Sequence, residues 1–396
     1  MADYPQLFIN ERADKRLRSG HLWLFSNEVD ATRSPLSTFN LGQQVAVVNA
    51  KGKLLGYAMV NPSQLICARF VSKKIPLGEK LIKQRIQSAY QLRQDKYKQP
   101  FYRLFYAEGD FLPGLVIDRY GSVVVTQITH QGLQPFRQVI SEVLLSIEGV
   151  DAVVFRQDMK SLKQEGLDVS NQTEIVGNVP ETLTLTENAC EFVIPSTTGQ
   201  KTGWFYDHRE NRAKIAELAE GKTVLDVFSY MGGWGLACMK AGAKALTAID
   251  ASNKALDYLH ESAQLNGFDA SVESIQGDAF QALEALLSES QKFDIVIIDP
   301  PAFIKKKKDQ KPGEKAYKKI NQLGLRLVKP GGYLVAASCC MHLPAERLQQ
   351  LVQEASRHVD RNLRLVYKAG HPHDHPVHPA IKETEYLKAQ IYQVTR

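Results

Sequence analysis

The stretch from Thr223 to Gly235, TVLDVFSYMGGWG, constrains the fold more than any other part of the chain. It begins with a short apolar run rich in branched residues, which is too brief for a helix and predicts a strand buried on both faces. A glycine-containing turn follows, and then a helix over residues 236–241 that stops before Gly242. The expected unit is a strand, a tight loop and a helix start, with Asp226 at the end of the strand. Such a loop lets a ligand approach free backbone N–H groups.

This unit alone is a weak signal, because its glycines lack the G-x-G-x-x-G spacing of dinucleotide-binding loops. The sequence that follows strengthens it. Three further short strands are predicted, and each leads to a carboxylate: residues 245–250 end in Asp250, residues 273–277 precede Asp278, and residues 293–298 precede Asp299. Parallel strands would place these acids along one carboxyl edge, which is where open α/β sheets bind ligands. Asp250 could there accept hydrogen bonds from ribose hydroxyls.

The order of these segments resembles motifs I to IV of class I S-adenosylmethionine-dependent methyltransferases. The sequence DPPAF at residues 299–303 is similar to motif IV of enzymes that methylate nucleobases. Over nearly its whole length the chain resembles a bacterial family of PUA-domain large-subunit (23S) ribosomal RNA cytosine-C5 methyltransferases. Three more segments support the resemblance: GHLWLF at 20–25, AEGDFLPGLVIDR at 107–119 and KTGWFYDHR at 201–209.

The resemblance implies a cofactor and two sets of site residues. S-adenosyl-L-methionine would be held by Asp226, Phe228, Ser229, Gly232, Asp250, Ala251, Asp278, Ala279 and Asp299. The target base would be contacted by Lys201, Asp207, Arg209, Pro300, Pro301 and Phe303. A plain cluster at the start of a helix is an equally good interpretation of Lys201, Asp207 and Arg209.

A fifth strand, at residues 333–337, leads into Ser338, Cys339 and Cys340 near the expected start of another helix. A thiol near a helix N-terminus and basic residues has its thiolate favoured. Carbon methylation needs such a group, since C5 of cytosine is a poor nucleophile until a thiolate adds to C6. The resemblance assigns this role to Cys339, although Cys340 is an alternative. Asp299, protonated or hydrogen-bonded, would hold the N3/N4 edge of the base.

Other functions remain open at this point. The same fold could methylate a guanine, in which case Cys339 would be incidental, or the chain could be a non-catalytic ribosome-assembly protein that binds RNA. An NAD enzyme is a weaker alternative, because DPPAF has no role in hydride transfer. Binding of S-adenosylmethionine separates the last two hypotheses from the enzyme, and replacement of Cys339 separates the two base specificities.

Length and composition agree with a multidomain globular protein. A chain of 396 residues with 44% hydrophobic and 23% charged residues predicts two or three domains. We expect an α/β chain with three parts: a β-barrel PUA-like RNA-binding domain at 1–75, a small central α/β domain at 76–190, and a Rossmann-like methyltransferase sheet at 191–396. Strands are expected at 45–48, 54–60 and 65–71, and helices at 79–98 and 136–147.

Charge and cysteine content favour a cytoplasmic protein with a polyanionic partner. The net charge of +6 permits binding to 23S rRNA or a large-subunit precursor, whether free or assembled. The basic residues lie near Arg12, Lys15, Arg16 and Arg18 and in an expected long loop at 303–315. The five cysteines lack metal-ligand spacing, and no apolar run reaches membrane-spanning length. The histidines at 371–378 are read as a loop rather than a metal site, with Asp374 and His375 toward the RNA. A homodimer is one alternative for the oligomeric state.

Overall fold

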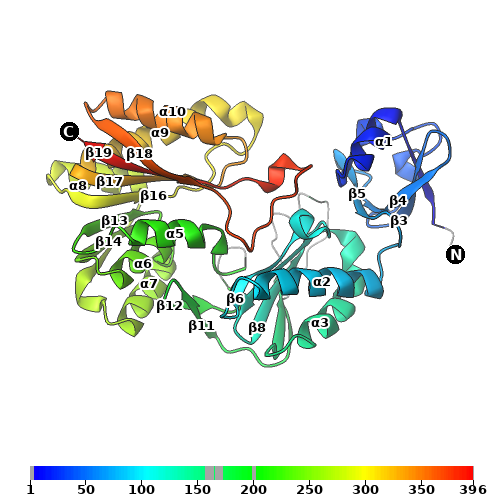
Figure 1. Ribbon diagram of the computed structural model, residues 1–396, viewed down its shortest axis with the longest axis horizontal. Coiled ribbons are helices and arrows are strands. Elements are labelled where there is room, and N and C mark those ends of the chain that lie inside the picture. The colour runs from blue at the N-terminus through cyan, green and yellow to red at the C-terminus, as the bar shows by residue number, and fades with distance from the viewer. Residues whose placement is uncertain (1–3, 157–164, 166–172, 199–201, 396) are drawn as a thin grey trace. The chain divides into compact units, whose positions relative to one another are not determined.

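The computed structural model describes residues 4–156, 165, 173–198 and 202–395 of the chain. Contacts divide the chain into two compact units, whose elements Figure 1 labels along the chain. Unit 1 comprises residues 1–181, 195–204 and 373–384, and unit 2 comprises residues 182–194, 205–372 and 385–396. Each unit is described separately below. The domain boundaries expected at residues 75 and 190 stay a prediction.

Unit 1 begins with a five-stranded sheet in the order β1-β3-β4-β5-β2. Its strands are β1 (Gln6–Ile9), β2 (Trp23–Phe25), β3 (Gln44–Asn49), β4 (Leu54–Val60) and β5 (Ile66–Ser72). The three strands expected from the sequence are therefore present as β3, β4 and β5. The side chain of Asn49 accepts hydrogen bonds from the N–H groups of Lys51 and Lys53, which closes the turn between β3 and β4. β1 and β2 are edge strands of this sheet, and its closure into a barrel stays a prediction.

The N-terminal basic cluster is helical, which the sequence analysis did not predict. Helix α1 (Glu11–Arg18) begins after Asn10, whose side chain accepts a hydrogen bond from the N–H of Ala13 at 3.0 Å. Arg16 is partly buried, and it donates to Glu28 and to the carbonyl oxygen of Trp23. This arginine holds the sheet edge together, so it is not a free phosphate contact.

A second sheet in unit 1 has the order β10-β9-β8-β7-β6. Its strands are β6 (Phe101–Tyr106), β7 (Leu115–Tyr120), β8 (Val123–Ile128), β9 (Ala152–Phe155) and β10 (Glu174–Val176), and α2 (Glu79–Gln94) and α3 (Arg137–Leu145) pack with them in one hydrophobic core. The predicted turn at residues 120–121 joins β7 and β8. Both helices are a few residues shorter than expected, as frayed ends often are.

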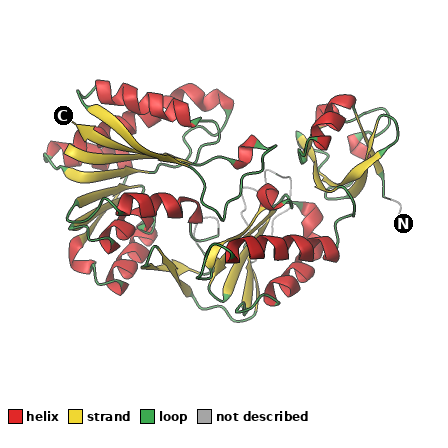
Figure 2. Cartoon of the chain, in the orientation of Figure 1, coloured by secondary structure: helices red, strands yellow, loops and turns green. Residues whose placement is uncertain are grey.

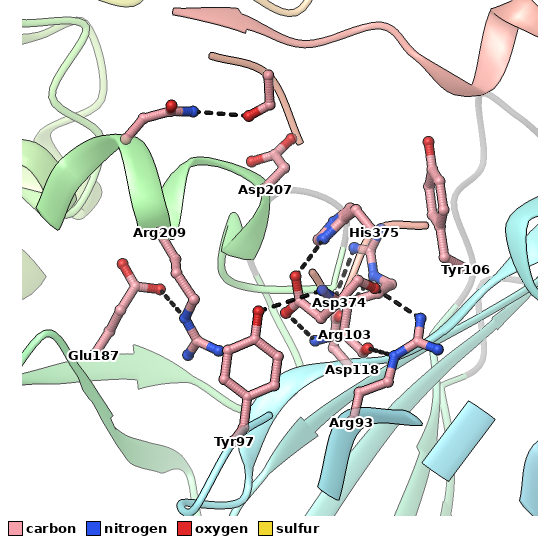
Figure 3. Close-up of polar contacts among 12 residues, drawn as sticks. Arg93, Tyr97, Arg103, Tyr106, Asp118, Glu187, Asp207, Arg209, Asp374 and His375 are labelled. Carbon is pink, nitrogen blue, oxygen red and sulfur yellow. Dashed lines mark hydrogen bonds and ion pairs between the residues drawn. The ribbon is translucent and has the colours of Figure 1, made fainter. Parts of the chain in front are cut away.

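Two buried ion pairs cross the interior of this α/β part, and Figure 3 labels Arg93, Arg103 and Asp118 among their members. Arg93 of α2 donates to both carboxylate oxygens of Asp110, at 2.7 Å each. Arg103 of β6 donates to both oxygens of Asp118 on β7, at 2.7 and 2.9 Å. Arg93 and Asp118 are fully buried. Bidentate geometry satisfies the charges that burial would otherwise leave unpaired.

The segment 373–384 is tied to these ion pairs through Asp374 (Figure 3). The Asp374 carboxylate accepts from the backbone N–H of Arg103 at 2.9 Å and pairs with His375 Nδ1 at 2.8 Å, while its carbonyl accepts from Arg93 at 2.7 Å. Asp374 and His375 are 0% and 1% exposed. The expectation that they line the RNA side is therefore wrong: they are buried structural groups.

Unit 2 is built on a seven-stranded sheet in the order β15-β14-β13-β16-β17-β19-β18. Its strands are β13 (Thr223–Val227), β14 (Ala245–Asp250), β15 (Val272–Gln276), β16 (Phe293–Ile298), β17 (Val328–Ser338), β18 (Asn362–Ala369) and β19 (Lys388–Thr395). The first five strands run parallel, and β19 is antiparallel to both of its neighbours. A separate two-stranded sheet pairs β11 (Thr182–Glu187) with β12 (Cys190–Pro195).

Helices cover both faces of the seven-stranded sheet (Figure 2). The helices are α5 (Arg209–Ala216), α6 (Gly233–Lys240), α7 (Asn253–Leu265), α8 (Ala279–Ser288), α9 (Gln310–Leu327) and α10 (Ala345–Arg357). Side chains of α8, α9 and α10 form one hydrophobic cluster with β13, β16 and β17. No helix among the described residues is both long and apolar enough to span a membrane.

The lysine-rich segment after β16 differs from its prediction. Residues 303–315 were expected to form one long loop, but α9 already begins at Gln310 and takes in Lys311 and Lys315. Pro312 lies in the first turn of α9, where its missing N–H has no intrahelical acceptor to lose. Lys305 to Lys308 remain exposed ahead of the helix.

Candidate active site

Four parallel strands of unit 2 end together at one edge of the sheet. Val227 pairs with Ile249 on one side and with Ile298 on the other, and Asp250 pairs with Gln276. The predicted row of acids therefore exists, formed by Asp226, Asp250, Asp278 and Asp299. The sheet order changes direction at β13, since β14 follows on one side and β16 lies on the other. Open α/β sheets bind ligands at such a switch point.

The loop between β13 and α6 is conformationally strained. Phe228 and Tyr230 have φ values of +63° and +50°, a region that side chains other than glycine rarely adopt. Gly232 follows at φ +81° and precedes the first turn of α6. A Cβ on Gly235 would lie 2.5 Å from Leu246, so this glycine is needed for close packing of α6 on β14. The loop thus bends tightly enough to leave the start of α6 at the sheet edge.

Asp226 is a buried acid with an unused oxygen. Its Oδ2 accepts a hydrogen bond from the N–H of Gly235 at 2.8 Å, but Oδ1 has no partner among the described residues. Burial raises the pKa of Asp226 to about 7, although the hydrogen bond from Gly235 works against this. The hydroxyl of Ser229 is likewise buried without a described partner. Unsatisfied buried polar atoms are rare in native proteins, and here they fit a ligand that brings its own donors.

Asp250 and Asp278 organise the neighbouring loops. Asp250 accepts from the N–H of Tyr230 at 2.9 Å and from that of Ser252 at 2.8 Å. A carboxylate has about four lone-pair sites, so it can still accept from a ligand hydroxyl. Asp278 caps α8 by accepting from the N–H of Gln281 at 3.1 Å. Ala251 and Ala279 follow these two acids directly, and their expected cofactor contacts stay predictions.

Asp299 is held by two aromatic side chains. Trp234 Nε1 donates to Asp299 Oδ2 at 2.9 Å, and His208 Nε2 lies 3.4 Å from Oδ1. Burial alone would raise the pKa of Asp299, but the charge and hydrogen bond of His208, together with the bond from Trp234, lower it below its usual value. The carboxyl group is therefore ionised at neutral pH. This favours the hydrogen-bonded alternative for Asp299 over the protonated one.

Asp207, just before α5, and Arg209, the first residue of α5, are buried against protein partners. Asp207 accepts a hydrogen bond from the hydroxyl of Tyr386 at 2.7 Å, and Arg209 lies 3.7 Å from Glu187. Figure 3 draws Asp207 and the Arg209–Glu187 pair. Lys201, the third candidate of this segment, lies outside the described residues. Contact of these three residues with a substrate stays a prediction.

The residues after Asp299 continue the chain from the carboxyl end of β16. Pro300 is buried, Pro301 is exposed and Phe303 is half-buried. The Phe303 ring packs edge-on against Tyr317 with ring centroids 4.9 Å apart, and it also contacts Phe228 and Phe280. Stacking of this ring on a base, as expected from the sequence, stays a prediction.

The two adjacent cysteines at the end of β17 have different surroundings. Cys340 is 1% exposed, and its thiol donates a hydrogen bond to the carbonyl oxygen of Ile304 at 3.0 Å. Cys339 is partly exposed. β16 and β17 run parallel with Ile298 opposite Ala336, so Cys339 and Asp299 follow neighbouring strands at the same edge. Neighbouring strands lie about 4.8 Å apart, which brings both residues within reach of one small ligand.

The remaining cysteines are packing residues, as expected for Cys67 and Cys238. Both are buried, as is Cys190. Burial raises the pKa of Cys67 and Cys190 to about 12, and it raises that of Cys238 as well. Such thiols are not nucleophiles at neutral pH. Among the described residues, no group of His, Cys, Asp and Glu could hold a metal ion.

Sequence reasoning missed three polar residues of the edge: His208, Trp234 and Lys388. His208 and Trp234 were hidden inside motifs, and their contact with Asp299 joins segments far apart in the chain. Lys388 starts the C-terminal strand and is only 8% exposed. A lysine followed by the apolar alternation of a buried strand was the available signal, because buried lysines need a partner.

Comparison with known proteins agrees with this geometry. A family model described as S-adenosylmethionine-dependent methyltransferase matches residues 103–393, and a model of a PUA-like domain matches residues 7–73. The ribosomal RNA large subunit methyltransferase I of Vibrio cholerae is 33% identical over 396 residues, which cover 97% of this chain and 98% of the relative. The protein of the same name from Klebsiella pneumoniae is 30% identical over 392 residues, 97% of each chain.

Solved structures support the same fold. A protein from Streptococcus mutans described as a SAM-dependent methyltransferase superposes with a TM-score of 0.82 at 22% identity, covering 98% of this chain and 100% of its own. A methyltransferase complexed with SAH gives a TM-score of 0.84 with the same identity and coverage. With its PUA-like N-terminal part and its matching sheet, the chain belongs to the S-adenosylmethionine-dependent methyltransferases, in the family of its relatives named ribosomal RNA large subunit methyltransferase I.

Proposed function

We propose that this protein methylates C5 of a cytosine in 23S rRNA, with Cys339 as a covalent nucleophile. The relatives' name supports a large-subunit rRNA substrate. The choice of base rests on one observation: a partly exposed thiol follows β17 directly beside the strand that carries Asp299. Methylation of a guanine would need no nucleophile there.

The carboxyl edge is suited to hold S-adenosylmethionine, which supplies an electrophilic methyl group when bound. Asp250 accepts hydrogen bonds from ribose hydroxyls, with Ala251 beside it. Asp226 and Ser229 offer buried oxygen atoms without described partners, which fit the donors of the methionine end. The strained backbone from Phe228 to Gly232 shapes this end of the site, and Asp278 and Ala279 would help to hold the bound cofactor.

The chain's own chemistry at the base is nucleophilic catalysis. The Cys339 thiolate adds to C6, which forms a C6–S bond and pushes electron density to C5. The cofactor, when bound, would supply the methyl group to C5 and keep the electron pair of the broken sulfur–methyl bond. A base removes the C5 proton, the C6–S bond breaks, and the thiolate is restored. The target nucleotide must be single-stranded or flipped out to reach Cys339.

Asp299 orients the base for this attack. Its ionised carboxylate accepts a hydrogen bond from the exocyclic N4 amino group of cytosine. Trp234 and His208 hold the carboxylate in place before the base arrives, so little reorganisation is needed. Pro300, Pro301 and Phe303 shape the wall of the pocket, as proposed from the family resemblance.

Two basic surfaces of the chain attract RNA phosphates. Lys305 to Lys308 are exposed just after the Asp299 segment. Each neutralised phosphate releases counterions, which makes such binding salt-dependent. The PUA-like part contributes a second contact, with Arg12 and Lys15 as exposed candidates on α1.

The function is tested by methyl transfer to 23S rRNA from cells that lack the protein, with mapping of the modified nucleotide. Cys339→Ala should lower the rate by about 10³-fold or more, since removal of a nucleophile disables the catalytic unit. Cys340→Ala is the matched control and should stay within about threefold, because the Cys340 thiol is buried and bonded to the carbonyl oxygen of Ile304 rather than open to a base. Methylguanine as product, or a Cys339→Ala variant at the normal rate, would refute the proposal.

A further inference from the structure

Lys388 is a buried cation at the active-site end of unit 2. It is the first residue of β19, in register with Ser338, the last residue of β17. Its Nζ donates to the carbonyl oxygen of Tyr386 at 2.6 Å and to that of Cys340. Both acceptors are neutral, and within the described part of the chain no carboxylate forms an ion pair with it. The positive charge is therefore not cancelled at contact distance.

The thiols of Cys339 and Cys340 are the groups whose ionised forms this charge can stabilise. The ammonium donates to the carbonyl oxygen of Cys340, the residue after Cys339, and it is close enough for the charges of both thiols to affect its pKa. An ammonium has three N–H donors, and two of them serve carbonyl groups, which leaves one. A lysine next to a cysteine lowers the pKa of the thiol, because the thiolate is stabilised relative to the neutral form.

We propose that the Lys388 ammonium stabilises the thiolate of Cys339 and is thus the positioning residue that makes this cysteine nucleophilic. The inference deepens the proposed function and depends on it for its catalytic meaning. The Cys339 thiol loses its proton to solvent, while Lys388 keeps its own proton throughout. Through its hydrogen bond to the carbonyl oxygen of Cys340, the lysine also fixes the turn after β17. One side chain therefore both stabilises the thiolate and positions the residue that carries it.

The groups around Lys388 agree with this role. Burial lowers the pKa of Lys388 to about 8, and the nearby Cys340, Cys339 and Glu385 raise it in turn. At pH 7 the lysine is therefore mostly charged. Glu385 is exposed, so solvent screens its charge. From α9, the hydroxyl of Tyr317 bonds to Ser338 Oγ at 2.9 Å, and burial raises its pKa, so it remains neutral.

The coupling has a defined pH window. Below the pKa of Lys388 the charge is present and the thiolate is stabilised. As pH rises above about 8, the lysine loses its proton and the support for the thiolate is lost. The pair should therefore titrate as a coupled system, with reactive thiolate already present at neutral pH.

The test is the pH dependence of Cys339 alkylation by iodoacetamide, measured on the full chain without RNA or cofactor and in a Cys340→Ala background. With Lys388 present, the midpoint should lie below the free value of about 8.5. In Lys388→Met and Lys388→Gln it should rise by about one unit, which is about a tenfold lower rate at pH 7. The glutamine keeps an N–H donor for the carbonyl groups but carries no charge. Comparison of the two variants therefore separates the effect of the charge from that of the hydrogen bonds.

Two controls define the outcome. Lys388→Arg keeps a charge and should restore the rate to within about threefold. Lys329→Met removes an exposed lysine near the other end of β17, where it pairs with Asp294, and should leave the midpoint unchanged. A folded Lys388→Gln or Lys388→Met protein with an unshifted midpoint would overturn the inference.

The result is independent of the proposed function. If Cys339→Ala still methylates rRNA at the normal rate, the function fails while the midpoint shift can still be measured. If Cys339→Ala is inactive but the Lys388 variants show no shift, only the role of Lys388 fails.

Discussion

The two units both bury charged groups, but they treat them differently. In unit 1, Arg93, Arg103, Asp110 and Asp118 satisfy one another in bidentate pairs, and Asp374 completes the network. At the sheet edge of unit 2, atoms of Asp226 and Ser229 stay buried without described partners, and the backbone beside them is strained. Buried polar atoms that all have protein partners stabilise the fold, whereas buried polar atoms without partners are suited to bind a ligand.

This difference separates the acids of unit 1 from Asp226, for which a role in ligand binding is proposed. Both groups contain buried acids, so burial or residue type alone does not separate them. Asp226 differs from the acids of unit 1 in that one of its oxygens has no partner among the described residues. The following predictions test that distinction, in order of decreasing effect.

Breaking a closed pair should cost stability. Arg103→Met leaves Asp118 buried without its cation, and we expect a loss of about 3–5 kcal/mol in the free energy of unfolding, measured by urea denaturation. Cofactor affinity of the folded fraction should not change, because Arg103 belongs to unit 1. A loss below about 1 kcal/mol would mean that the network is not structural.

Changing Asp299, which lies at the carboxyl edge of the unit 2 sheet and is held by Trp234 and His208, should cost activity instead. Asp299→Asn keeps the shape but removes the charge that His208 and Trp234 hold, and methyl transfer should fall by about 10²–10³-fold in single-turnover assays. The melting temperature should stay within about 3 °C, since the amide oxygen can still accept from Trp234. A large drop in melting temperature with normal activity would reverse the assignment.

Asp226 gives a pH-dependent test of the same idea. Its folded pKa of about 7 exceeds the ordinary value of 3.8, so the folded chain holds a proton that the unfolded chain has lost. The contribution of Asp226 to the free energy of unfolding therefore falls as pH rises from about 4 to about 7. Asp226→Asn removes the penalty, and we expect it to be about 1–3 kcal/mol more stable than the parent protein at pH 8 but not at pH 4. Equal stability at both pH values would contradict the assigned burial effect.

The smallest effect compares two hydroxyl groups. Thr202 donates to Asp118 in unit 1, so Thr202→Val should destabilise by about 1 kcal/mol. Ser229 has no described partner, so Ser229→Ala should leave stability within about 0.5 kcal/mol and weaken cofactor binding a few-fold. Calorimetric unfolding and isothermal titration with S-adenosylmethionine measure both. A loss of stability in Ser229→Ala with none in Thr202→Val would contradict the distinction between the two units.

Much of the unit 2 sheet could be predicted, because each strand is a short apolar run and the acid follows it locally. The positions of β13, β14 and β16 and the turn between β7 and β8 depend on such local signals. The helix α1 was missed because its eight residues are mostly charged and only Ala13 and Leu17 are buried.

The site itself was only partly accessible to sequence reasoning. Acids at strand ends could be placed on one edge, but their state depends on partners from distant segments. His208 and Trp234 decide that Asp299 is ionised, and Ile304 decides that Cys340 is buried with a bonded thiol. Asp374 and His375 looked functional by type, yet long-range pairing with Arg93 and Arg103 makes them structural.

The most direct test of the catalytic edge is to trap the bond between Cys339 and the target base. With S-adenosylmethionine and 23S rRNA transcripts containing 5-fluorocytidine, C5 carries no proton to remove after methyl transfer, so the C6–S bond cannot break. We predict a denaturation-resistant protein–RNA adduct whose cross-linked peptide maps to Cys339 and which is absent in Cys339→Ala. Turnover of normal rRNA with no adduct on the fluorinated transcript, or an adduct at another residue, would contradict it.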